Sequence, residues 1–221
     1  DGTPAWARRF GSAGSEIPTA LGMDAAGDLW LSGTFLDTTV DFGGGALTAS
    51  GADVFLLKLG AAGNHIWSRS VTASDTNWAN GTLSVAPGGG VVVVGRFAGS
   101  LTTGAPSPLV SAGGTDLFVA RYDATGQHVF SQHFGGAGGD WAVTVDARGD
   151  TVVVGGWFTG PVDFGGGARV GRGFVLGLSF TDGGYRWVRT YSGPLDVWDV
   201  AVDLAGGVFV IGEFYNTVDF G

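Results

Sequence analysis

The feature that most constrains the fold of this chain is a tandem repeat with a period of about 60 residues. An aromatic anchor recurs at Trp6, Trp67, Phe130 and Trp187, at intervals of 61, 63 and 57 residues. The residues around it repeat as WARRF, WSRSV, FSQHF and WVRTY. In repeat proteins one unit cannot bury its apolar face alone, so neighbouring units must stack. The sequence therefore predicts a stack of similar units.

Each unit contains four strand-like runs, which we letter a to d in chain order, with the anchor in run d. Run a reads TALGMD, GTLSV, AVTVD and VAVD, and run b reads DLWLSGTF, GVVVVGRF, TVVVGGWF and GVFVIGEF. Run c reads DVFLLKLGAAG from Asp53, DLFVARYDATG from Asp116 and, more loosely, GFVLGLSF from Gly173. The alternation of apolar with small or polar residues in run a is the period of a strand. No stretch of about 12 residues has helical periodicity with caps, so the sequence predicts an all-β fold.

Four short antiparallel strands per unit predict a β-propeller with four-stranded blades of about 60 residues. The predicted boundaries are a strand d over 4–10, blades over 15–71, 78–134 and 140–191, and a partial blade over 196–221. Because the chain opens on run d and stops after run b, the N-terminal strand is positioned to close the last blade. That blade still lacks run c, and an open edge favours aggregation. We therefore favour a chain cut from a larger propeller over a ring of about four blades completed by another segment.

Glycine accounts for 43 of the 221 residues, against an average of about 7%. Interspersed with valine-rich runs, the glycines predict turns between many short strands. Gly33, Gly95, Gly156 and Gly212 recur in run b, two residues before a phenylalanine. We expect these four to let a strand bend or a neighbour approach closely.

Charge and composition exclude several classes of protein. The formal net charge is −9, with only 11 lysine and arginine residues, so the chain lacks the basic surface of a nucleic-acid or membrane-surface binder. Apolar runs such as Val91–Val94 are far too short to span a bilayer. The absence of cysteine excludes disulfides and thiolate metal sites. Because the chain starts at Asp1, we expect a processed product or a fragment from which any targeting segment is missing.

Several of these strings also match a known family pattern. They are GGAGGDWAVTVDARGDTVVVGGWFTG from Gly135, the VDFGGG copies at Val40 and Val162, and GADVFLLKLGAAGNHIW from Gly51. At these residues the chain resembles the bacterial seven-bladed β-propeller repeat family, known as SBBP repeats, and the resemblance covers the whole chain. It implies a secreted or cell-surface bacterial protein and almost nothing about the ligand. The second unit departs from the pattern, with LTTGAPSP in place of VDFGGG, and the third lacks the Asp before run c.

Tryptophan recurs on the loop that enters run a. Eleven residues after the anchors stand Ile17, Trp78, Trp141 and Trp198, and one or two residues earlier stand Glu16, Asn77, Asp140 and Asp196. A tryptophan ring can pack on the C–H face of a pyranose while an acid or amide binds its hydroxyls, so the three tryptophans and four polar residues are candidate ligand-binding residues. Several such sites would add avidity. The alternative, which we favour, is that the acid caps the loop and the ring packs between blades.

The VDFGGG copies offer weak calcium candidates. They place Asp41, Asp163 and Asp219 beside flexible backbone, and calcium prefers oxygen ligands. One carboxylate is few for an ion that takes about six to eight oxygens, so an Asp that hydrogen-bonds its own turn is the simpler account. We expect no cofactor.

The expected function is binding rather than catalysis. His65 and His128 fall at equivalent repeat positions, hence in different blades, and the acids are spread one per turn. Our first hypothesis is a secreted or cell-surface protein-interaction or scaffold module. The alternatives are a multivalent carbohydrate-binding lectin that uses the loop tryptophans, and a hydrolase or lyase with a site at the central channel. Expected partners are a protein or a surface glycan, with self-association through the incomplete blade, and not nucleic acid or an inserted membrane.

Overall fold

The computed structural model describes residues 2–36, 39–49, 51–75 and 80–218. Every regular element in these ranges is a β-strand, and every strand pair is antiparallel. The predicted all-β class is therefore confirmed. None of the described residues forms a helix long and apolar enough to cross a membrane.

The four runs of each of the first three repeats form consecutive strands of one sheet, and the fourth repeat contributes runs a and b. Sheet 1 contains β1 (Ser15–Met23), β2 (Leu29–Leu36), β5 (Ala52–Leu59) and β6 (His65–Ala73). Sheet 2 contains β7 (Asn80–Val85), β8 (Val91–Phe97), β11 (Asp116–Tyr122) and β12 (His128–Phe134). Sheet 3 contains β13 (Asp140–Arg148), β14 (Thr151–Phe158), β17 (Gly173–Ser179) and β18 (Tyr185–Tyr191), and sheet 4 contains β19 (Leu195–Val202) and β20 (Val208–Phe214).

A short hairpin lies between runs b and c of each of the first three units. The hairpins are β3 (Thr39–Asp41) with β4 (Ala46–Thr48), β9 (Ser100–Thr102) with β10 (Leu109–Val110), and β15 (Val162–Asp163) with β16 (Ala168–Arg169). The first and third are built by the VDFGGG copies, whereas β9 belongs to the departing second unit and extends sheet 1 beyond β6.

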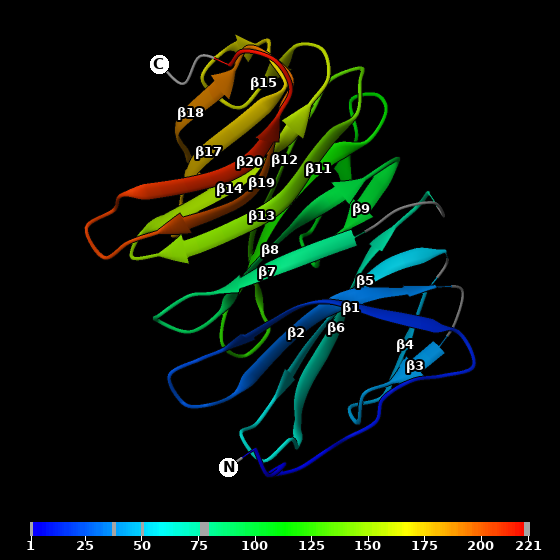
Figure 1. The fold of residues 1–221 in the computed structure, drawn as a ribbon. Coiled ribbons are helices and arrows are strands. Elements are labelled where there is room, and N and C mark those ends of the chain that lie inside the picture. Colours follow the sequence, from blue (N-terminus) through cyan, green and yellow to red (C-terminus); the bar gives the residue numbers. More distant parts are fainter. Residues whose placement is uncertain (1, 37–38, 50, 76–79, 219–221) are drawn as a thin grey trace.

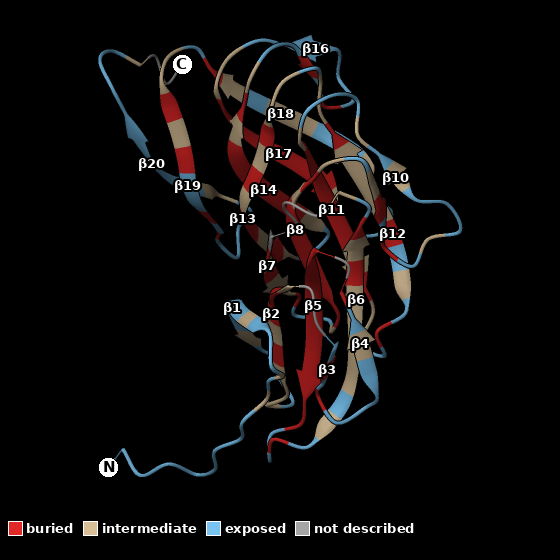
Figure 2. Ribbon diagram, turned by 90° about the vertical axis from the view of Figure 1, so that its right-hand side faces the viewer, coloured by how far each residue is buried: buried red, intermediate tan, exposed pale blue. Residues whose placement is uncertain are grey.

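The sheets stack face to face in chain order, and the core lies between them (Figure 1). Trp30 and Leu56 of sheet 1 pack with Leu83 and Phe118 of sheet 2. The interface of sheets 2 and 3 and that of sheets 3 and 4 are built from equivalent positions. Figure 2 shows that the buried residues concentrate in the middle strands of this stack.

The glycines of run b permit a recurring distortion of run a. Strand a of sheets 1, 3 and 4 contains an irregularity opposite the glycine of run b. A Cβ atom on Gly156 would lie 1.9 Å from the carbonyl oxygen of Trp141, and one on Gly33 would lie 2.4 Å from that of Ile17. The same holds for Gly212 and Asp196, at 2.4 Å. The predicted close approach is thus confirmed at three of the four glycines, and Gly95 pairs with another glycine, Gly81.

The prediction of a strand over residues 4–10 is wrong, because these residues form no strand. They nevertheless pack as run d packs elsewhere. The indole Nε1 of Trp6 donates to the carbonyl of Ala61 (2.9 Å), as that of Trp67 does to Ala124 (3.2 Å). In each complete unit run d pairs with run c, and no described strand c lies beside residues 4–10.

The prediction that the N-terminal segment closes the last sheet is also wrong for this structure. The N-terminal segment lies against sheet 1, and the two ends of the chain lie at opposite ends of the stack (Figure 1). Each sheet contacts its neighbours in sequence, so the described residues form an open arc.

Candidate binding site

Three tryptophans from two sheets gather into one cluster, which we call the aromatic platform: Trp141, Trp157 and Trp198. Trp157 lies between the others, with its ring centroid 5.5 Å from that of Trp141 and 5.2 Å from that of Trp198. Trp141 and Trp157 are half-buried, whereas Trp198 is 48% exposed. The structure thus brings together two of the three predicted tryptophans, while Trp78 and Asn77 lie outside the described residues.

The equal sequence spacing of Trp141 and Trp198 does not give them equal places in the fold. Trp141 is paired with Trp157, whereas Trp198 lies at the irregularity between Val197 and Asp199. The physical reason is the loop between runs d and a, which spans 135–139 before β13 but only 192–194 before β19. The shorter loop moves Trp198 along the strand toward Trp157 instead of placing it as the counterpart of Trp141.

A cation from a third sheet adjoins the platform. The guanidinium carbon of Arg96, on β8, lies 5.4 Å from the ring centroid of Trp141, and burial lowers the pKa of Arg96. The indole Nε1 of Trp141 is buried and donates to no described group. Cation–π contacts of this kind strengthen when they are shielded from water. The site therefore presents tryptophan rings beside a positive charge.

Sequence reasoning missed Trp157 and Arg96, although a signal was present. Both occupy the position of run b just before its phenylalanine, where the four units carry Thr34, Arg96, Trp157 and Glu213. A repeat position whose residue type changes from unit to unit is not required by the shared fold. Such a position marks individual function better than the recurring anchors do.

The predicted acidic partners of the tryptophans are already engaged within the protein. Asp140 is fully buried and accepts the backbone N–H groups of Gly136 (2.9 Å) and Thr159 (3.1 Å). Glu16 accepts the backbone N–H of Ser12 (3.2 Å). Asp196 makes a two-pronged ion pair with Arg172, whose Nη2 lies 2.8 Å from Oδ2. These carboxylates cap loops or join sheets, as in the alternative that the sequence favoured.

Two buried carboxylates lie between sheets 2 and 3. Asp116 and Asp140 are both 0% exposed, and burial raises the pKa of each. The Oδ2 of Asp116 accepts the N–H of Ala112 (2.9 Å), whereas Oδ1 has no described partner. In the next interface the strand register places Arg172 and Leu195 at the equivalent positions, so no acid pair recurs there. The acid pair is therefore specific to one interface rather than a repeated site.

The raised pKa of Asp116 predicts a pH dependence of stability. Because the folded state holds the proton more tightly than the unfolded state, stability falls as pH rises from 3.8 towards the folded pKa. The variant Asp116→Asn keeps an acceptor for Ala112 but cannot ionise. We expect its melting temperature, relative to the unsubstituted protein, to rise between pH 3 and pH 7.

A control of opposite sign tests the same linkage. Hydrogen bonds from the backbone N–H groups of Gly43 and Gly45 lower the pKa of Asp41, so this carboxylate stabilises the fold above pH 3.8 and loses that effect as pH falls. The relative melting temperature of Asp41→Asn should therefore fall between pH 3 and pH 7. Parallel pH profiles for the two variants would contradict the prediction.

The aspartates predicted as weak calcium ligands instead accept hydrogen bonds from the backbone of their own turns. The Oδ1 atom of Asp41 accepts the N–H groups of Gly43 (2.7 Å) and Gly45 (3.0 Å), and Asp163 binds Gly165 (2.7 Å) and Gly167 (2.9 Å) in the same way. Asp219 lies outside the described residues. No group of three or more histidine, aspartate or glutamate side chains among the described residues could hold a metal ion.

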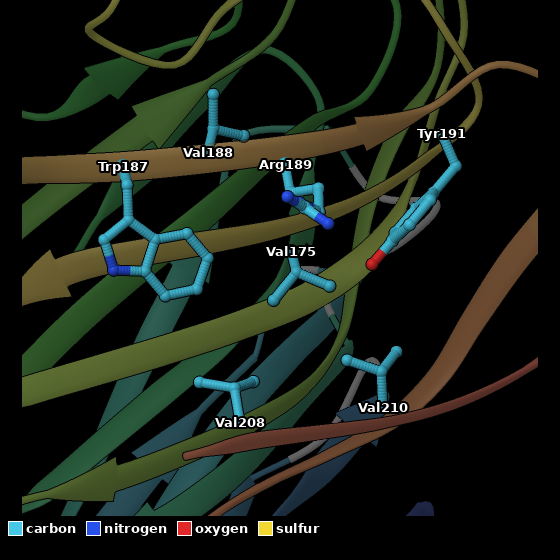
Figure 3. Close-up of a pocket in the computed structure, with 7 residues that line it drawn as sticks. All are labelled: Val175, Trp187, Val188, Arg189, Tyr191, Val208 and Val210. Carbon is cyan, nitrogen blue, oxygen red and sulfur yellow. The ribbon is translucent and has the colours of Figure 1, made fainter. Parts of the chain in front are cut away.

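A hollow of about 500 Å³ lies between sheet 3 and β20. Figure 3 shows Val208 and Val210 of β20 on one side and Val175, Trp187 and Tyr191 of sheet 3 on the other. In the preceding interface the counterpart of Val175 is Val119, which packs with strand c of the next sheet. Sheet 4 has two described strands, so no strand c faces Val175 and the hollow results.

Comparison with known proteins finds similarity among solved structures. No family model matches the chain, and no curated protein matches it, so membership of the bacterial propeller repeat family stays a prediction. Among solved structures, the chain is similar to the Pan2 WD40 domain of Neurospora crassa, with 11% sequence identity and a TM-score of 0.27. The match covers 92% of this chain and 81% of that one.

Proposed function

We propose that this chain belongs to a β-propeller and acts as a protein-interaction module whose contact site is the aromatic platform. The observation that carries the proposal is the cluster of three tryptophans from two sheets, with Trp198 48% exposed and Arg96 alongside. Tryptophan and arginine are the residues most enriched where protein partners gain binding energy. Large apolar rings held in place by neighbours also lose little entropy on binding.

The hydrogen-bonding state of the acids favours a protein partner over a glycan. Sugar recognition needs polar groups free to bind hydroxyls beside the ring. Asp140 and Asp196 already hold backbone N–H groups or Arg172. The rings of Trp157 and Trp198 also meet at 64° rather than forming one flat stacking surface.

The proposal includes a binding role rather than a catalytic one. The acids whose pKa is raised, Asp116 and Asp140, are fully buried between sheets rather than facing a cleft, whereas a general acid or base must reach its substrate. A secreted or cell-surface setting, which the family resemblance implies, and a scaffold role complete the proposal.

Trp198→Ala tests the contact site. Peptide ligands selected against the unsubstituted chain from a random display library should bind the variant about 30-fold more weakly, since a hot-spot residue contributes about 2 kcal/mol or more. Titration calorimetry measures the change. Leu204→Ala is the matched control, because Leu204 is 91% exposed in the turn between β19 and β20. The affinity of this variant for the selected peptides should not change.

Two results would count against the proposal. Equal affinity of the Trp198→Ala variant for every selected peptide would remove the platform as the contact site. Binding on a glycan array that depends on Trp198, with no peptide selected, would favour the carbohydrate-binding alternative.

A further inference from the structure

The two ends of the stack each present an apolar sheet face to solvent. On β1, at one end, Leu21 and Met23 are both 67% exposed. On β20, at the other end, Phe209 is 62% and Ile211 is 65% exposed. Figure 2 shows exposed residues along both β1 and β20. Exposed apolar faces of this kind mark interaction surfaces.

The exposed face of β1 is the one that packs against the preceding sheet in every later unit. By strand register, Leu21 corresponds to Leu83, Val145 and Val200. Those three counterparts are 8%, 8% and 5% exposed, against 67% for Leu21. Each lies in the core cluster shared with the sheet before it.

The exposed face of β20 is the one that packs against the following sheet in every earlier unit. Phe209 corresponds to Trp30, Val92 and Val153, which are 1%, 0% and 0% exposed. Each of these lies in the cluster shared with the next sheet. The faces of β1 and β20 are therefore the two halves of the interface that the protein already forms between its own sheets.

The exposed face of sheet 1 and the exposed face of sheet 4 are also formed by the same runs of the repeat. On sheet 1 the strand-c side of the face is already covered, because Phe55 and Leu57 pack under Phe10 and the β3–β4 hairpin. The side formed by runs a and b is less covered, because Leu29 and Leu31 of run b are half-buried and Leu21 and Met23 of run a are exposed. Sheet 4 consists of runs a and b among the described strands, so its face matches the less covered part of sheet 1.

We propose that copies of this chain associate head to tail, with β20 of one copy packed on β1 of the next. In this contact Phe209 and Ile211 of one copy meet Leu21 and Met23 of another, as Val92 and Val94 meet Val145 and Ala147 inside the protein. The contact joins two different surfaces, so it adds copies in one direction until a ring closes or a filament grows. Few side chains take part, so the association is weak, with a dissociation constant between about 1 μM and 1 mM. The net charge of −9 opposes it, and added salt therefore strengthens it.

Sedimentation velocity over a concentration series tests the proposal with the whole chain. The average mass should rise with concentration, and Leu21→Asp and Ile211→Asp should each keep the protein monomeric. Leu204→Asp, at a more exposed position in the turn between β19 and β20, off both faces, should associate as the unsubstituted chain does. Because the substituted side chains are exposed, circular dichroism should confirm that all three variants fold.

Mixing the variants distinguishes head-to-tail contact from any other. Leu21→Asp keeps the β20 face intact and Ile211→Asp keeps the β1 face intact. Their mixture should therefore form dimers that grow no further, although each variant alone stays monomeric. A mixture that stays monomeric, an unsubstituted chain that is monomeric at every concentration, or an equal loss of association with Leu204→Asp would each overturn the proposal.

Discussion

Replacement of Trp30 by alanine is expected to lower the free energy of unfolding by about 3–5 kcal/mol. Trp30 is 1% exposed in the core between sheets 1 and 2, with its ring centroid 5.4 Å from that of Trp67. Its indole N–H donates to Asp24 (3.0 Å), and the ammonium of Lys58 lies 4.6 Å from its ring centroid. Alanine removes this packing and leaves a cavity beside a buried charge.

Urea unfolding followed by circular dichroism measures the loss. Trp198→Ala is the matched control, since Trp198 is about half exposed at the platform, and we expect it to cost about 1 kcal/mol or less. The comparison also shows whether the Trp198→Ala variant is folded for the binding test. Equal losses for the two variants would contradict the burial difference on which the prediction rests.

Gly156→Ala is expected to destabilise the protein by about 3 kcal/mol, because the added methyl group meets backbone that cannot move aside. Its Cβ would lie 1.9 Å from the carbonyl oxygen of Trp141 and 3.0 Å from the ring of Phe174. To relieve the clash, β13 would have to separate from β14, which breaks the strand pairing that holds Trp141 beside Trp157.

Gly88→Ala provides the control for Gly156→Ala. No atom lies within 4 Å of a Cβ placed on Gly88, and its backbone does not need positive φ. Alanine there should leave stability unchanged or raise it slightly, because it reduces the freedom of the unfolded chain. Stability of Gly156→Ala within about 0.5 kcal/mol of the unsubstituted protein would show that run a does not need its irregular backbone.

Much of the fold was predictable because it depends on local pattern. The four runs of each of the first three repeats form successive strands, since alternation and β-branched residues report strand geometry directly. The turn aspartates were also assigned correctly, as Asp41 and Asp163 bind the N–H groups of the glycines that follow them. The prediction of a strand over 4–10 was wrong because it rested on the similarity of WARRF to the sequence of run d. A β-strand also needs a partner strand beside it.

Less of the candidate site was predictable. Trp141 and Trp198 lie at the same number of residues from their anchors, so the sequence predicted equivalent places for them. The loop before β19 is shorter than the loop before β13, and a fixed spacing does not take that difference into account. Trp157 and Arg96 come from other strands, so their proximity to Trp141 depends on the strand register and on how sheets 2 and 3 stack. No sequence spacing encodes that distance.

By itself the sequence determined the all-β class, the four-run unit and the positions of the turns, because strand period, glycine and aspartate act over a few residues. Only the tertiary structure decided which faces of equivalent strands are buried. Leu21 and Val145 hold the same place in run a, yet one is 67% and the other 8% exposed. The difference arises because burial depends on the neighbouring sheet, and no described sheet precedes sheet 1 in the stack.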